Sequence, residues 1–136
     1  MPSSLPRRVE ELHRRQAAMY AGGPVDPVAE MLAEDVVWHV PGASPIAGEH
    51  RGRQAAIEYF RARRELAGHS MQLHPRELMV GEDFVVQLVD GSAEIAGEAV
   101  SWSTVGVYRF DHGRVVEAWL VPSDLKKFDR IWSQAG

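Results

Sequence analysis

The sequence contains no cysteine, which excludes disulfide bridges and any chemistry that depends on a thiolate. It also lacks an apolar run approaching the ~20 residues that a membrane-spanning helix needs. The first residues, MPSSLPRRVEELHRRQ, contain no apolar stretch of the kind found in signal peptides. We therefore expect a cytoplasmic protein without a membrane partner.

A basic excess is missing as well. The 15 lysine and arginine residues are outnumbered by 19 aspartate and glutamate residues, which gives a formal net charge of -4. The densest basic stretch, residues 61–64, is followed by Glu65 and falls on a predicted helix. Because proteins that bind nucleic acid usually gather a basic excess on one face, we expect no nucleic-acid partner.

Motifs for metals, cofactors and covalent catalysis are also absent. The six histidines show no HExxH or His-x-His spacing and have no carboxylate at ligand spacing. The sequence contains no GxSxG, Walker or GxGxxG motif. We expect neither a metal site nor a bound cofactor.

The pattern of the 136 residues predicts one globular domain over residues 1–136, with 45% hydrophobic and 25% charged residues. Ser3 and Ser4, followed by Pro6, predict the start of a first helix, which ends at Gly22. A short second helix is predicted to begin at Asp26. Further helices are predicted over residues 53–67 and 123–134. Strands are predicted over residues 36–40, 71–80 (interrupted at Pro75), 84–95, 99–111 and 115–121, and residues 41–52 are predicted as a loop.

The predicted antiparallel strands are apolar on both faces. Phe84, Val86 and Leu88 alternate with Val85 and Val89 on one strand, so both faces of the sheet need a cover. The helices can cover only one face. We therefore expect a homodimer through the outer face of the sheet, with three aromatic residues as candidates to fill the interface: Trp102, Tyr108 and Trp119.

Three segments resemble a known family. Residues 33–42, residues 48–52 leading into a helix, and residues 108–119 are similar to the SnoaL-like branch of the NTF2-like superfamily. The resemblance implies a cone-shaped α+β fold, in which N-terminal helices pack on a strongly curved, mostly antiparallel sheet and enclose an apolar pocket. Members of the superfamily include ketosteroid isomerases, polyketide cyclases, epoxide hydrolases, dehydratases and domains that only bind or assemble, so the fold does not settle the function.

The resemblance also implies positions for site residues. Isomerase-like members carry a general-base carboxylate just before the Pro/Gly turn, and the matching position is His39, whose imidazole pKa of ~6.5 suits proton transfer. The isomerases' acidic hydrogen-bond donor matches Ser103, and their tyrosine donor falls near Arg15 or Gln16. Family enzymes with a carboxylate on the last strand carry it at the position of Leu120, so that acid is missing.

Alternation and helical spacing add further residues to the predicted pocket. Gln87 is the one polar residue in a strand set with Val85 and Val89, so an inward amide would orient an oxygen atom of a ligand. With His39 as the catalytic residue, the predicted substrate-binding residues are Gln16, Tyr20, Phe60, Gln87, Ser103, Ala118 and Leu120.

Several of these residues also have a plain structural explanation. His39 can be satisfied by a neighbouring backbone carbonyl or solvated at the end of its strand. Gln87 can lie at an exposed edge, and Tyr20 and Phe60 are equally suited to an ordinary core.

Two classes of function follow from these residues. The first is a cofactor-independent enzyme of the isomerase, cyclase or dehydratase type, in which His39 acts as acid and base on a small apolar metabolite. The alternative is a non-catalytic domain, which either binds a ligand or serves as a dimerisation module.

Overall fold

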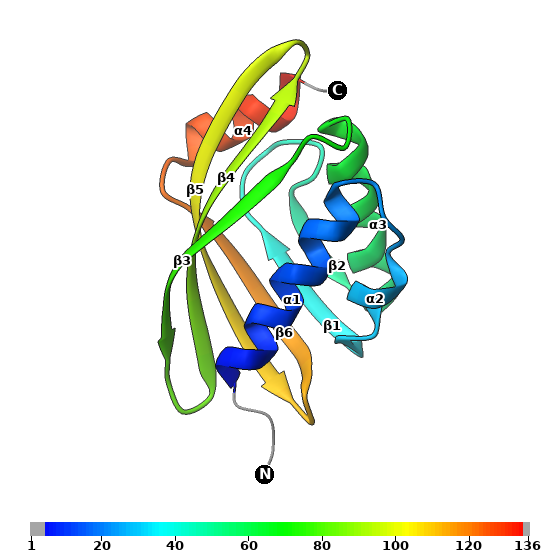
Figure 1. Ribbon diagram of the computed structural model, residues 1–136, viewed down its shortest axis with the longest axis vertical. Helices are drawn as coiled ribbons and strands as arrows, with labels where there is room; N and C mark the ends of the chain where they lie inside the picture. Colours follow the sequence, from blue (N-terminus) through cyan, green and yellow to red (C-terminus); the bar gives the residue numbers. More distant parts are fainter. Residues whose placement is uncertain (1–4, 135–136) are drawn as a thin grey trace.

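The computed structural model describes residues 5–134, which form four helices and six strands (Figure 1). The predicted helix start at Ser3 and Ser4 lies outside the described residues. In chain order the elements are α1 (Leu5–Tyr20), α2 (Asp26–Ala29), β1 (Leu32–Val40), β2 (Gly48–Arg51), α3 (Arg53–Leu66), β3 (Gln72–Val80), β4 (Phe84–Ile95), β5 (Glu98–Asp111), β6 (Arg114–Pro122) and α4 (Leu125–Gln134). None of the helices within residues 5–134 is long and apolar enough to cross a membrane.

All six strands belong to one curved sheet in the order β2-β1-β6-β5-β4-β3. Strands β3 to β6 form an antiparallel meander, β2 pairs antiparallel with β1, and only β1 and β6 run parallel. The long strands β4 and β5 bend strongly along their length (Figure 1). The predicted α+β fold with a strongly curved, mostly antiparallel sheet is therefore confirmed.

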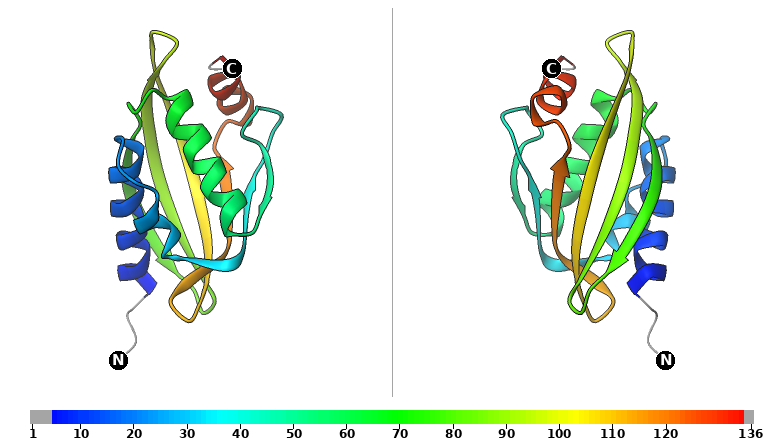
Figure 2. Two further views of the ribbon diagram at one scale, coloured as in Figure 1. Left: turned by 90° about the vertical axis from the view of Figure 1, so that its right-hand side faces the viewer. Right: turned by 90° about the vertical axis from the view of Figure 1, so that its left-hand side faces the viewer.

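The hydrophobic core lies between the helices and the concave face of this sheet. In Figure 2, α3 runs along the concave side, between α1 and the pair β1–β2. Helix α1 contributes Val9, Leu12 and Met19, and α4 contributes Phe128 and Trp132, all of which are fully buried. The helices thus cover one face of the sheet, which matches their apolar stripes.

Two local features of the strands depart from a regular ladder. The pairing of β3 with β4 shifts register between Pro75 and Leu78, and β3 is an edge strand. Both observations agree with the prediction at Pro75, because proline cannot donate to a ladder hydrogen bond. Strand β2 was predicted as loop, since its sequence Gly-Glu-His-Arg has no apolar alternation, and it forms only by pairing with the end of β1.

Two hairpins turn through residues with positive φ. Ala96 and Gly97 have φ values of 53° and 82°, and His112 and Gly113 have values of 52° and 79°. Two central residues with positive φ are typical of the type I′ turn, whose twist matches that of the flanking strands. Gly97 and Gly113 adopt this conformation freely, whereas Ala96 and His112 carry the steric cost of a Cβ atom.

Two glycines on the concave face leave room for aromatic rings. A Cβ on Gly91 would lie 2.3 Å from the ring of Trp102, its direct cross-strand partner, and a Cβ on Gly106 would lie 2.6 Å from the hydroxyl of Tyr108. Trp102 and Tyr108 therefore lie in the interior. The prediction that they fill an interface on the outer face is wrong, and of the three named aromatics only Trp119 lies on that face.

Candidate functional site

A small cavity lies between α1, α3 and the concave face of the sheet. Its volume is about 30 Å³, which is the room of about one water molecule. Three of the residues predicted to bind substrate, Gln16, Tyr20 and Leu120, line it. The full lining is His13, Gln16, Tyr20, Trp38, Arg63, Leu73, Val89, Thr104, Gly106, Tyr108 and Leu120.

Polar atoms without partners concentrate at this cavity. The Nδ1 and Nε2 atoms of His13, the hydroxyl of Tyr20 and the Nε atom of Arg63 are buried and make no hydrogen bond within the described part of the chain. Buried polar groups in folded proteins are normally hydrogen-bonded, because an unpaired one costs about 1–3 kcal/mol. Three unpaired side chains thus border one cavity that has the volume of about one water molecule.

Helical spacing explains why these side chains meet. His13 follows Val9 by four residues and precedes Gln16 by three, so it lies on the buried stripe of α1. Arg63 follows Phe60 by three residues on α3 and points to the same interior. Its neighbour Arg64 lies off this stripe, with 16% of its side chain exposed, and donates to the carbonyl of Gly23 at 2.8 Å.

Burial keeps the ionisable side chains of the cavity, apart from arginine, in their neutral forms. It lowers the pKa of His13 to about 4 and raises the pKa of both Tyr20 and Tyr108 above the ordinary value. At neutral pH the cavity thus presents a neutral imidazole and two phenols. Arg63 keeps its charge, because the guanidinium does not lose its proton in proteins.

His39 lies on the opposite face of the sheet. Its Nε2 atom bonds to Oε2 of Glu117 at 2.7 Å, and its ring stacks on Trp119 with the centroids 5.2 Å apart. This hydrogen bond lowers the pKa of Glu117 below the ordinary value. The expectation that His39 points into the interior is therefore wrong, because Trp38 occupies the inward position and alternation sends its neighbour outward.

The other predicted residues do not converge with His39. Gln87 faces inward, but its Nε2 atom donates to the carbonyls of Glu77 and Leu88. The side chain thus supplies hydrogen bonds where the pairing of β3 with β4 is irregular, beside Pro75. Ser103 lies on the outer face and donates to Asp90 at 2.7 Å. Of these three predicted site residues, His39 and Ser103 thus lie on the outer face with different partners, and Gln87 lies inside.

Phe60 and Ala118 are ordinary core residues. Both are fully buried, and the Phe60 ring meets Trp38 edge-to-face at 4.9 Å. Ala118 pairs directly with Trp38 across β6 and β1, and its small side chain leaves room for the indole. Neither residue lines the cavity.

Eight of the eleven lining residues were not predicted as site residues, and two of these eight, His13 and Arg63, carry buried unpaired atoms. A signal was present for both, since each falls on the apolar stripe of its helix at i+3 or i+4 spacing from a core residue. The predicted substrate-binding residues include Gln16, Tyr20 and Phe60 from the same two helices, but neither His13 nor Arg63. A polar residue inside an apolar helical stripe is unusual, and this is the sequence signal that points to both positions.

A larger hollow of about 560 Å³ lies outside the core. It is lined by polar side chains at the start of α4 and on β4 and β5, among them Asp90, Ser103, Asp124 and Lys127. None of the buried unpaired atoms belongs to it. Within residues 5–134, no group of three or more His, Asp or Glu side chains is arranged to hold a metal ion.

Comparisons with known proteins agree with this architecture. A family model described as SnoaL-like domain matches residues 13–118. Bal32a from a soil-derived mobile gene cassette is 28% identical, with a TM-score of 0.82, and the match covers 93% of this chain and 97% of Bal32a. A protein of Rhodopseudomonas palustris that is provisionally named an isomerase is 18% identical, with a TM-score of 0.79 and coverages of 96% and 97%. TerC, co-crystallised with polyporic acid, is 19% identical, with a TM-score of 0.76 and coverages of 91% and 96%, and no curated protein matches the sequence.

Proposed function

The chain belongs to the SnoaL-like domain family, and on that premise we propose that it binds a small molecule with a largely apolar body in the interior cavity. The observation that carries the proposal is the convergence of buried, unpaired polar atoms of His13, Tyr20 and Arg63 on one cavity. Ligand sites typically combine apolar walls with a few polar groups that fix orientation. A ligand oxygen placed among these side chains would satisfy atoms that the chain itself leaves unpaired.

Access to the cavity requires movement of its apolar walls. The present volume of about 30 Å³ admits no metabolite. Leu73 and Leu120 are the half-buried members of the lining, whereas Tyr20 and Tyr108 are buried. We therefore expect the two leucines to rotate or shift when a ligand enters.

The observations favour binding over catalysis of the isomerase, cyclase or dehydratase type. Among the described residues no carboxylate lines the cavity, and the imidazole of His13 has no acid beside it to orient it for proton transfer. His39 is bonded to Glu117 on the outer face. A carrier or ligand sensor fits these residues better than an enzyme of these types. The cytoplasmic location stays a prediction.

The binding proposal can be tested with thermal-shift measurements on a panel of phenols and monoterpenes. Leu120→Trp adds an indole beside the cavity and is expected to abolish the rise in melting temperature that a binding compound gives the wild type. His39→Ala, on the same sheet but the opposite face, is the control and should retain that rise. The reverse outcome, with binding lost only in His39→Ala, would move the site to the outer face.

The outer face supports the alternative of a dimerisation surface. Met79, Val86, Val107 and Trp119 stand opposite one another across β3, β4, β5 and β6, so they form one uncharged row. Phe84 and Val121 beside this row expose 41% and 48% of their surface. A second copy of this chain fits such a patch, because a two-fold axis brings identical apolar surfaces together.

We therefore propose that the chain forms a homodimer through this row and that ligand binding occurs in each subunit. Val107→Lys places a charge at the centre of the row and is expected to give a monomer in light scattering coupled to gel filtration. Ser133→Lys, on the exposed side of α4, adds the same charge elsewhere and should remain dimeric. A wild type that is monomeric at micromolar concentration would refute this second proposal and leave the first intact.

A further inference from the structure

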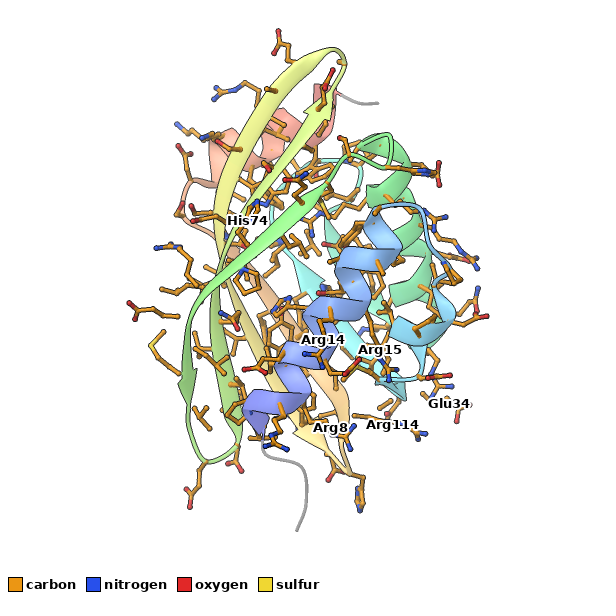
Figure 3. The ribbon with its side chains drawn as sticks, in the orientation of Figure 1. Arg8, Arg14, Arg15, Glu34, His74 and Arg114 are labelled. Atoms are coloured by element: carbon orange, nitrogen blue, oxygen red, sulfur yellow. The ribbon has the colours of Figure 1, made fainter. Side chains whose placement is uncertain are left out.

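Arg63 differs from the paired arginines of the chain in having no acidic partner. It is 5% exposed, and no carboxylate within residues 5–134 lies at ion-pair distance from its guanidinium. Arg15, by contrast, lies on the solvent side of α1 (Figure 3). It contacts Glu11 at 2.9 Å and Glu30 at 3.1 Å. Arg64, the next residue along α3, contacts Glu65 at 3.1 Å.

The groups around Arg63 attract its charge without neutralising it. Its Nη1 atom donates to the hydroxyl of Tyr59 at 3.2 Å. The rings of Tyr20, Trp102, Phe128 and Trp132 lie with centroids 4.9–5.8 Å from its Cζ atom, which is the range of cation–π contacts. A guanidinium in such an interior keeps its full positive charge, and a buried charge without a counterion is costly.

The free Nε atom identifies the direction in which a counterion is missing. Arg63 lines the cavity, and its Nε atom is buried without a hydrogen-bond partner. The hydroxyl of Tyr20 lines the same cavity and is also unpaired. Two hydrogen-bond donors, one of them charged, thus border a cavity in which the described residues place no negatively charged acceptor.

We propose that the interior cavity selects ligands that carry a carboxylate, which pairs with Arg63 and accepts a hydrogen bond from Tyr20. This inference rests on the proposed function, since it assumes that a ligand enters the cavity. A single positive charge among aromatic rings fits a monoanion, whereas a phosphate dianion would leave excess negative charge in an apolar site. A carboxylate also matches the planar donor fork of arginine.

The role of His13 follows from its neutral state. A neutral imidazole carries one N–H group, and this donor can serve the second oxygen of a bound carboxylate without a further charge. Leu73, Val89 and Leu120 supply apolar wall that suits the body of an organic acid, and the lining also includes the polar side chains of Gln16 and Thr104. The ligand class is therefore a small organic acid with an apolar body.

The inference can be tested by comparing two probes of nearly identical shape, benzoate and benzamide, at equal ionic strength. Isothermal titration calorimetry and thermal shift on the wild type are expected to show benzoate binding at least about tenfold more tightly, because the amide lacks the negative charge and the second acceptor oxygen of the carboxylate. This comparison needs no variant. Equal binding of the two probes would overturn the inference and leave the proposed function standing, whereas binding of neither probe nor of any panel compound would overturn both.

Variants then assign the preference to Arg63. Arg63→Met is expected to bring the two dissociation constants within about twofold of each other, because the charged donor is removed. Arg61→Met, which removes the same charge from an exposed position two residues earlier, should keep the wild-type preference. A preference for benzoate that persists in Arg63→Met would overturn the assignment.

Tyr20→Phe provides the test if Arg63→Met does not fold. It removes one hydroxyl and leaves the ring that packs on Arg63 in place. We expect it to weaken the binding of benzoate by about threefold to tenfold and to leave that of benzamide unchanged. An equal loss for both probes would contradict a specific bond to the carboxylate.

Discussion

Protonation of His13 is expected to destabilise the protein in mild acid. His13 is 6% exposed, and burial lowers its pKa from 6.5 to about 4. In the unfolded chain the imidazole takes up a proton near its ordinary pKa of ~6.5, whereas the folded protein resists protonation down to about pH 4. The unfolded state therefore binds more protons between these values, and the free energy of unfolding falls as the pH falls.

The size of this effect follows from the two pKa values. One pKa unit corresponds to about 1.4 kcal/mol, so the shift from 6.5 to about 4 amounts to about 3 kcal/mol once the pH is below both values. Between pH 7.5 and pH 5 the loss is about 2 kcal/mol, because only part of the titration lies in that range. Such a loss is a large fraction of the stability of a domain of this size.

Urea denaturation at several pH values measures the effect. His13→Gln replaces the imidazole by a group that does not titrate, so the difference in unfolding free energy between wild type and variant should change by about 2 kcal/mol from pH 7.5 to pH 5. His74→Gln on the exposed edge of β3 (Figure 3) is the control and should show little change. A difference that is constant with pH, or an NMR titration of the His13 ring with a midpoint near 6.5, would refute the reasoning.

Three further substitutions test the fold. Ala96→Asn should raise the free energy of unfolding by about 0.5–1 kcal/mol, because asparagine tolerates positive φ better than alanine, and thermal unfolding measures the gain. Gly91→Ala should cost about 1–3 kcal/mol in urea denaturation, since the new Cβ meets the Trp102 ring. Gln87→Leu should cost about 1–3 kcal/mol in the same assay, because the carbonyl of Glu77 loses its donor; an unchanged midpoint would contradict this reading.

The parts of the fold that depend on local pattern could be predicted from the sequence. The turn at Gly97 follows from the tolerance of glycine for positive φ, the interruption at Pro75 follows from the missing donor of proline, and the structure agrees with both. The alternation of Val85 and Val89 with Phe84 and Leu88 likewise fixed the two faces of β4. The period of two is set by the backbone and does not depend on distant residues.

The contents of the interior could not be derived in the same way. Trp102 and Tyr108 were assigned to the outer face because their strand is apolar on both sides. Their inward position is explained by the missing side chains of Gly91 and Gly106, which leave room for the two rings. Which ring lies over which glycine depends on cross-strand register and on ring orientation, and a single sequence specifies neither. His39 was placed in the interior because it matches the position of the general base in isomerase-like members. Alternation with the larger, more apolar Trp38 already favoured an outward imidazole.

The buried unpaired polar side chains at the cavity come from the helices rather than from the strands. Arg63 and Arg64 are adjacent in sequence but lie about 100° apart around α3, and this difference leaves one buried without a counterion and the other paired at the surface. His13 enters the interior in the same way, through its place on the buried stripe of α1. The ligand selection that we propose therefore depends on polar residues of the helical stripes, and positions carried over from the strands of relatives do not identify these residues.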